Sequence, residues 1–258
     1  MATRYLVPGG DGNYNSTSNW SATDGGASGA TFPVAADDII INANSLNAPI
    51  TVNVVSACKS FNASSYTGTV SMNSDLSVEG TAALGDITLS SGMTITGSGT
   101  FSKKGTSTTG RITSNGVIFD CNFSFTNTVV CTTLISGAMQ VNGNLSSTLN
   151  STTTTTINTG TISVGGDIIH NNPLAGTSTI QLIGTNPSTI TQVATRYLWT
   201  NLIINKGAGA FNPVNLYWGA SSRTLTYTSG IVNHTGVLYS NSSTLNTNGM
   251  IWNIIKPL

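Results

Sequence analysis

Two adjacent carboxylates, at Asp37 and Asp38, are the most enzyme-like residues of this chain. Paired carboxylates can hold a metal ion or divide the acid and base roles of a hydrolase between them. Neighbouring residues on a strand point to opposite faces, so this pair cannot share one site unless it lies in a turn. We therefore expect an aspartate of the pair to cap the turn after Pro33, and we assign both residues a structural role.

Other residues that could do chemistry are few and scattered. Glu79 is the only glutamate, and its convergence with Asp75 and Asp86 across a neighbouring coil is an alternative. His170 and His234 lack the spacing of metal ligands, no G-x-S-x-G motif is present, and we expect both histidines in turns. The sequence therefore predicts a protein with no enzymatic activity, no bound metal and no cofactor.

Small hydrogen-bonding side chains take the place of charges along this sequence. Thr (41), Ser (32) and Asn (28) make up 101 of the 258 residues, whereas 9 Lys or Arg balance 9 Asp or Glu. This balance argues against nucleic-acid binding, which needs clustered cations to neutralise phosphates, and we interpret adjacent Lys103 and Lys104 as a solvated turn. Because 38% of the residues are hydrophobic, the chain is expected to fold.

The cysteines and the N-terminus bear on redox state and export. Cys58, Cys121 and Cys131 form no C-x-x-C pair, and an odd number cannot all be paired. We expect them to be buried as small apolar residues, with a Cys121–Cys131 bridge as the alternative.

Residues 1–9 contain no apolar signal-peptide core, and no stretch reaches the roughly 18 apolar residues of a membrane span. The sequence predicts neither export nor membrane insertion.

Apolar residues recur at every second position from residue 49 onward, which is the spacing of side chains on one face of a strand. Ile50, Val52 and Val54 are one example. Turn signals such as Asn-Gly and Gly-Gly separate these segments, and no 11-residue window keeps the apolar spacing of an amphipathic helix. The pattern predicts an all-β chain.

Some of the alternating segments resemble one another. Residues 76–80, 139–143 and 162–166 share an apolar-x-Val-x-Gly core, and residues 93–97 are a looser copy. Successive cores are separated by 17, 46 and 23 positions, which indicates a repeat near 20 residues, the length of one solenoid coil. We predict a β-solenoid similar to a parallel β-helix, with a β-sandwich or jelly roll as the alternative.

Three regions follow from the glycine and aromatic content. Residues 1–48 are irregular and glycine-rich, and we expect them to cap and attach the solenoid, because an uncovered first coil would expose a sheet edge. Residues 49–195 are the predicted solenoid body. Residues 196–258 form an aromatic-rich C-terminal β region, expected to act as a second cap or as an oligomer contact.

Exposed aromatic rings beside Asn and Thr are typical of carbohydrate-binding surfaces, since sugar rings stack on aromatic faces. Trp199, Tyr217 and Trp218 are the candidates for a glycan or subunit contact, and buried packing is the alternative for each. A flat rank of threonines would instead suggest an ice-binding solenoid, for which Thr94-x-Thr96, Thr224-x-Thr226 and the threonine run at 152–156 are the candidate segments.

The N-terminal segment carries an ordered series of motifs. An aromatic and glycine-rich stretch at 4–15 precedes Asn19-Trp20-Ser21, the Gly25-Gly26 turn and Pro33-x-x-x-Asp37-Asp38. This series resembles the opening of proteins often encoded among the structural genes of tailed bacteriophages, and residues 225–230 and 246–253 are similar to their strand repeats. The resemblance implies a virion surface component such as a head fibre, capsid decoration protein or tail fibre.

These observations together lead to one functional expectation. We expect a homo-oligomer, a trimer in our interpretation, that is made in the host cytoplasm and resides on the phage particle. Its expected partners are sister chains, capsid or tail proteins and host surface glycans, and Trp20, Asp37 and Asp38 are expected to belong to the attachment segment. A tailspike-like protein that binds or degrades polysaccharide and an ice-binding solenoid are the alternatives.

Overall fold

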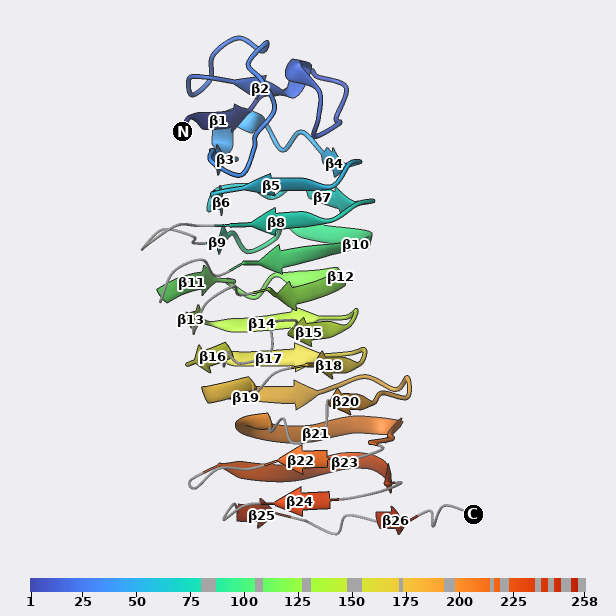
Figure 1. The fold of residues 1–258 in the computed structure, drawn as a ribbon. Helices are drawn as coiled ribbons and strands as arrows, with labels where there is room; N and C mark the ends of the chain where they lie inside the picture. The colour runs from blue at the N-terminus through green and yellow to red at the C-terminus, as the bar shows by residue number, and fades with distance from the viewer. Residues whose placement is uncertain are drawn as a thin grey trace.

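The computed structural model describes residues 1–79, 87–104, 109–126, 131–147, 155–171, 174–192, 198–213, 216–218, 223–234, 238–240, 244–246 and 252–254. Strands make up 58% of the structure and helices 3%, and the strands stack as parallel coils of a β-solenoid (Figure 1). This architecture confirms the predicted fold, and the sandwich alternative does not apply.

Each coil contributes to three parallel ladders, which we name faces A, B and C. Face A is built by β1 (Thr3–Leu6), β3 (Asp38–Ile40), β6 (Ser60–Ala63), β9 (Ile87–Leu89), β11 (Thr109–Thr113), β13 (Cys131–Ser136), β16 (Thr155–Asn158), the starts of β19 (Leu174–Leu182) and β21 (Leu198–Phe211), β22 (Leu216–Trp218) and β24 (Leu238–Ser240).

Face B follows face A along most coils. It is built by β4 (Ile50–Val52), β7 (Thr69–Met72), the starts of β10 (Thr94–Lys103) and β12 (Ile118–Phe125), β14 (Ala138–Val141), β17 (Thr161–Val164), the later part of β19, the middle of β21, the start of β23 (Thr224–His234) and β25 (Thr244–Asn246).

Face C closes each coil. It is built by β5 (Ser56–Cys58), β8 (Leu76–Val78), the ends of β10 and β12, β15 (Leu145–Ser147), β18 (Ile168–His170), β20 (Ile190–Gln192), the ends of β21 and β23, and β26 (Trp252–Ile254). The longer strands β10, β12, β19, β21 and β23 therefore bend around a corner and serve more than one face.

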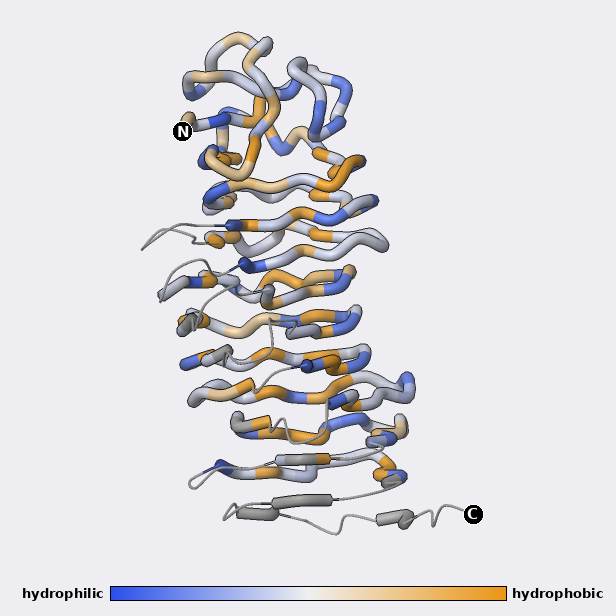
Figure 2. Tube along the Cα trace, viewed as in Figure 1, coloured by the Kyte–Doolittle hydropathy of each residue, from blue (hydrophilic) through white to orange (hydrophobic). Residues whose placement is uncertain are grey.

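The core is a single apolar cluster inside the three faces. Its residues are among the hydrophobic positions drawn in orange along the coils in Figure 2. Alternate residues point inward on each strand, so the stacked inward positions of face B are all apolar. They run through Ile50, Val70, Ile95, Phe119, Val141, Val164, Leu182 and Ile204. Phe119 supplies the coil between Ile95 and Val141, which explains their double separation in the sequence.

One of the repeat cores belongs to another face. Val78 lies on face C and pairs with Lys103, whereas Ile95, Val141 and Val164 are stacked on face B. The 17-residue step from Val78 to Ile95 is therefore not one coil. The near-20-residue period was right because successive face B partners are one coil apart, but the assignment of residues 76–80 to the same repeat was wrong.

Residues 1–48 lie at one end of the stack (Figure 1). They contain the 3-10 turns η1 (Thr17–Asn19) and η2 (Ala43–Ser45) and strand β2 (Trp20–Ser21), which pairs antiparallel with β1. Trp20 is fully buried there, and its ring packs edge-to-face against that of Tyr14 with the two ring centroids 5.4 Å apart. Its Nε1 donates to the Tyr14 carbonyl at 2.7 Å. This segment gives the first coil a packed end.

Candidate functional site

A notch at Gly137 interrupts the corner between faces A and B. Residues 114–117 separate β11 from β12 on the coil before it, and Thr159 with Gly160 separates β16 from β17 on the coil after it. Gly137 alone joins β13 to β14. The short corner therefore lies between two longer ones and leaves an open hollow of about 450 Å³, within the roughly 300–1,000 Å³ usual for ligand sites.

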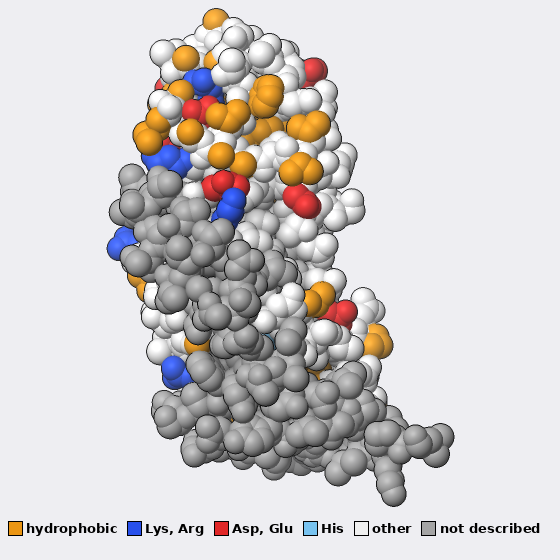
Figure 3. Space-filling model, in the orientation of Figure 1, with side chains coloured by type: hydrophobic (Ala, Val, Ile, Leu, Met, Phe, Trp, Pro, Cys, Tyr) orange, Lys and Arg blue, Asp and Glu red, His pale blue; other side chains and the backbone are white. Residues whose placement is uncertain are grey.

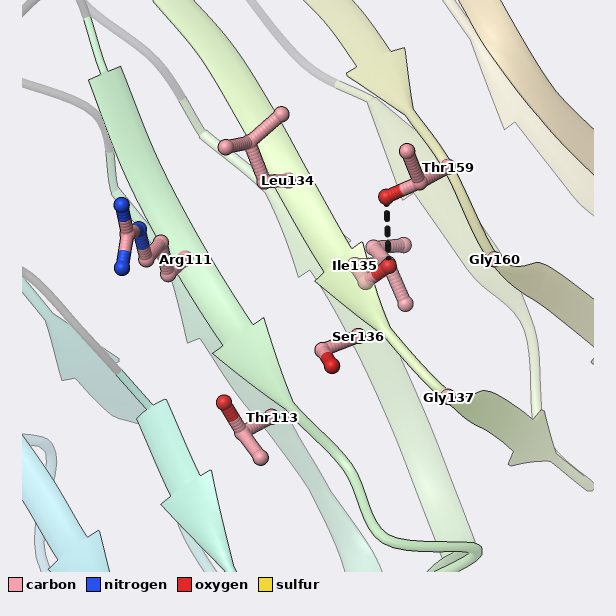
Figure 4. Close-up of a pocket in the computed structure, with 8 residues that line it drawn as sticks. All are labelled: Arg111, Thr113, Leu134, Ile135, Ser136, Gly137, Thr159 and Gly160. Atoms are coloured by element: carbon pink, nitrogen blue, oxygen red, sulfur yellow. Dashed lines mark hydrogen bonds between the residues drawn. The ribbon is translucent and has the colours of Figure 1, made fainter.

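Two outward rows of side chains form one wall of the notch (Figure 4). Arg111 on β11 is paired in register with Leu134 on β13, and Thr113 is paired with Ser136. Arg111 and Ser136 are exposed, while Thr113 and Leu134 are half-buried. The wall thus presents one guanidinium, two hydroxyls and one apolar side chain to solvent.

The opposite wall is held by the backbone. Thr159 has a left-handed φ of 61°, and its Oγ1 donates to the Ile135 carbonyl at 2.7 Å. Gly160 also has a positive φ, and a Cβ at this position would lie 2.7 Å from the Gly137 oxygen. Glycine is therefore required here, because a side chain would collide with the neighbouring coil and close the notch.

The chemistry of the notch suits binding better than catalysis. Its described lining contains no carboxylate, histidine or cysteine, so a general acid, a base and a nucleophilic thiol are all missing from this part of the chain. Arg111 supplies a fixed positive charge, and the hydroxyls supply neutral donors and acceptors. Sequence reasoning missed this site because its signal is a difference in corner length between coils.

The carboxylates of Asp37 and Asp38 are held apart, as expected. Asp37 is buried, its N–H donates to the Val34 carbonyl at 2.8 Å, and its carboxylate accepts from the Val34 and Ala2 N–H groups. This geometry confirms the predicted cap of the turn after Pro33. Asp38 instead lies 3.2 Å from Lys59 Nζ. The pair therefore forms no common site.

The aromatic candidates differ in what the structure describes. Trp218 is 1% exposed, and its Nε1 donates to the Thr200 carbonyl at 3.1 Å. The buried packing expected for Trp218 is thus confirmed, and its alternative role as a surface contact is wrong. Trp199 and Tyr217 lie on β21 and β22, but their side chains are outside the described part of the structure. The contact predicted for them stays a prediction.

Three basic residues expected in turns lie in strands. His170 ends β18 and is 0% exposed, His234 ends β23, and Lys103 ends β10 at 1% exposure. The turn predictions were wrong because the corners of the solenoid are short, so the strands extend to these residues. Lys104 follows directly and pairs with Glu79 at 2.9 Å.

The proposed acidic cluster does not form from the described residues. Asp75 and Glu79 lie at opposite ends of β8, where Asp75 accepts from the Thr100 N–H at 2.8 Å and Glu79 pairs with a lysine. Asp86 lies outside the described residues. In the part of the chain that is described, no three His, Cys, Asp or Glu side chains form a group that could hold a metal ion.

The cysteine predictions are partly confirmed. Cys58 and Cys121 are buried free thiols, and burial raises the pKa of both, that of Cys121 to about 12. The alternative bridge from Cys121 to Cys131 is therefore wrong. The side chain of Cys131 is outside the described set.

The outward positions of face B do not form a rank of threonines. Their chemistry changes from coil to coil, through Thr69, Thr94, Ile118, Gln140, Ser163, Gln181, Ile203 and Thr226. An ice-binding surface needs one repeated side chain on a flat face, so the described residues of this face do not support that alternative.

Comparison with known proteins adds no relative. No protein-family model, curated protein or solved structure matches the chain. The fold defines the class of protein, a three-faced β-solenoid with a packed N-terminal end. Within the described residues, no helix has the length and apolar character needed to cross a membrane.

Proposed function

We propose that this protein is a structural, non-enzymatic component of a bacteriophage virion surface, a fibre or capsid decoration element that acts as a homo-oligomer and adheres to host glycans. The observation that carries the proposal is the role of the N-terminal motifs. The residues that resemble phage structural proteins are the same residues that build the packed end of the solenoid.

The packing of this end supports a defined attachment module. Asp11 accepts from the Asn13 N–H at 2.9 Å and from Asn19 Nδ2 at 2.7 Å, and these two bonds hold the pKa of Asp11 at about 2. A Cβ at Gly10 would lie 2.1 Å from the Asn19 side chain. The Gly-Gly-Asp-Gly-Asn stretch at 9–13 thus wraps around the side chain of Asn19, and Asn19 is the residue directly before the buried Trp20.

An apolar surface lies on the same end. Met1 is 87% exposed, Phe32 39% and Val34 50%, and hydrophobic side chains gather over the upper part of the molecule in Figure 3. Arg4 on β1 donates to the Thr31 carbonyl at 2.8 Å, which holds the segment with Phe32 and Val34 beside the N-terminus. Exposed apolar patches of this kind are typical of protein contacts, and we assign this one to the particle or to sister chains.

The flanks of the rod support a passive role. Arg4, Lys59 and Lys104 each lie within 3.9 Å of a carboxylate, so much of the described charge is paired. A neutral flank limits nonspecific adsorption to charged envelopes and nucleic acid. The described acids make separate structural contacts, which favours a structural role over hydrolysis.

Immunogold labelling of purified virions with an antibody against this protein tests the assignment. We expect label at a fixed position on the particle, and protein found only in infected-cell cytoplasm would overturn it. A matched pair of variants tests attachment: Phe32→Asp should abolish incorporation, whereas Val55→Asp, at an 81% exposed site on the β4–β5 loop, should not.

Light scattering at micromolar concentration tests self-association. We expect the mass of a trimer. A monomer would remove the oligomer claim while the labelling experiment still decides the virion assignment.

A further inference from the structure

We propose that a second hollow of the rod, at the corner between faces B and C beside Asp120, binds a neutral sugar unit through two of its adjacent hydroxyl groups. This inference rests on the proposed adhesion to host glycans, and it specifies where the glycan binds and which chemical class is recognised. The Asp120 carboxylate accepts hydrogen bonds from the two hydroxyls, and Ile118 contacts the C–H face of the sugar ring.

Unequal corners on neighbouring coils create this hollow. The strands β10, β12 and β14 lie on successive coils (Figure 1), and residues 97–99 of β10 lie opposite Cys121 alone. A Cβ at Gly97 would lie 2.3 Å from the Met72 oxygen, and one at Gly143 would lie 2.4 Å from the Cys121 oxygen. These glycines let the coils approach closely without a side chain in the corner, which leaves a hollow of about 430 Å³.

Asp120 places an exposed carboxylate in the lining of the hollow. Its Oδ1 accepts from Asn142 Nδ2, and the Asn142 Oδ1 accepts in turn from Gln140 Nε2 at 2.7 Å. Among the described residues, Oδ2 of Asp120 accepts no hydrogen bond, and none of the ion pairs involves this carboxylate. The chain of amides therefore orients a carboxylate that still has acceptor capacity for a ligand.

An apolar side chain lies beside this carboxylate. Ile118 is 41% exposed and precedes Asp120 by two residues on β12, so both side chains lie on the same side of the strand. Ile118 is paired in register with Gln140 on β14, and Asp120 lies beside Asn142. With about 4.8 Å between strands and roughly 6.6 Å between alternate residues, these four side chains form a patch of the size of one sugar ring.

The chemistry of the patch selects a neutral ligand that is rich in hydroxyl groups. The two carboxylate oxygens of Asp120 can accept from adjacent hydroxyls, while the Asn142 amide and the Ser98 hydroxyl are polar partners for the rest of the ring. The exposed surface of Ile118 suits the C–H face of the sugar. Side chains of both kinds are needed for a sugar, which is polar at its edge and apolar on its faces.

Charged ligands match this hollow less well. Its described lining contains no lysine, arginine or histidine, so an acidic sugar would meet only the negative charge of Asp120. A calcium ion takes roughly 6–8 oxygen ligands, and Asp120 supplies the one carboxylate of the described lining. The site therefore favours direct contact with a neutral sugar over an anion or a bound divalent cation.

A glycan array of neutral, acidic and amino-sugar oligosaccharides, followed by calorimetric titration of the strongest neutral binder, provides the test. We expect neutral oligosaccharides with adjacent free ring hydroxyls to bind. The affinity should fall at least tenfold for the O-methylated form, which keeps the rings but has no hydroxyl to donate. Binding of the acidic or amino-sugar oligosaccharides alone, or no binding of any neutral one at millimolar concentration, would overturn the proposal. Binding that EDTA abolishes and Ca²⁺ restores would also overturn it, since a cation would then lie between Asp120 and the sugar.

Variants locate the site. Asp120→Ala should weaken binding at least tenfold, and Asp120→Asn should keep part of it, because the amide retains one acceptor oxygen. Ile118→Ser should weaken binding several-fold, whereas Ile231→Ser, at a 43% exposed position of β23, is the matched control and should bind as the wild type. Circular dichroism of each variant confirms its fold. Unchanged binding by Asp120→Ala would refute the assignment, and equal losses in the two isoleucine variants would refute the contact with Ile118.

The result is separable from that of the labelling experiment. Protein that labels virions but binds no neutral oligosaccharide would refute the sugar site and leave the virion role in place. Protein that binds the oligosaccharide through Asp120 but never occurs on virions would refute the virion role.

Discussion

The phenylalanine cluster inside the solenoid allows a paired test of how its core is stabilised. Phe101 and Phe125 are both 0% exposed, so replacing either by leucine removes a similar amount of buried apolar surface. They differ in ring contacts. Phe101 lies 5.4 Å from Phe61, 5.6 Å from Phe119 and 6.1 Å from Phe123, whereas Phe125 has one described ring partner, Phe123, at 5.2 Å.

The expected difference follows from these contacts. Each aromatic pair contributes about 0.5–1.5 kcal/mol beyond area burial, so Phe101→Leu loses two more pairs than Phe125→Leu. We therefore expect Phe101→Leu to lower the free energy of unfolding by about 1–3 kcal/mol more than Phe125→Leu. In a chain of this length the two melting temperatures should differ by roughly 2–12 °C.

Urea unfolding followed by tryptophan fluorescence and by far-ultraviolet circular dichroism measures this difference. Both residues lie on neighbouring coils, β10 and β12, so partial unfolding of the distant coils affects the two variants alike. Equal destabilisation by the two variants, or a larger effect of Phe125→Leu, would show that the ring contacts do not stabilise the core as argued.

Three further changes test the corners of the solenoid. Gly143→Ala should destabilise the protein by about 3 kcal/mol in urea unfolding, because the added Cβ would lie 2.4 Å from the Cys121 oxygen; a neutral result would contradict this close approach. Asn144→Ala should lower the free energy of unfolding by about 1 kcal/mol, since the Asn144 Oδ1 accepts from the Asp167 N–H on the next coil at 2.8 Å. Unchanged stability would show that this hydrogen bond between coils does not stabilise the fold. Burial raises the pKa of Tyr66 to about 12, against about 10 in the unfolded chain. The stabilisation that this shift gives the folded state is therefore complete below pH 10 and is lost as the pH rises towards 12. Tyr66→Phe should flatten the fall in stability over that interval, as measured by urea unfolding at several pH values, and an identical fall would refute the assignment.

The sequence by itself determined the fold class. Period-two alternation fixes which side chains share a face of a strand, and this local property does not depend on how the strands are stacked. The near-20-residue recurrence of Ile95, Val141 and Val164 then predicted the coils, since each of these residues occupies the same inward position of face B. The turn cap at Asp37 was also predictable, because it depends on residues four positions or fewer apart.

Other features depended on the direction of side chains around each coil. Trp218 was a candidate surface ring, yet it is buried, and the sequence around it does not show which side of β22 faces the core. Lys103 and His170 were expected in turns, but both end strands inside the solenoid. Burial of such residues is set by neighbours on adjacent coils, 18 to 25 positions away in the sequence.

The notch at Gly137 was decided by tertiary structure alone. No residue in it stands out in the sequence, because Arg111, Thr113 and Ser136 are ordinary outward residues of two different strands. The hollow exists because a corner of one residue is stacked between two longer corners. The sequence determined the strands through local alternation, whereas stacking of coils with unequal corners decided where the surface is hollowed and which side chains meet there.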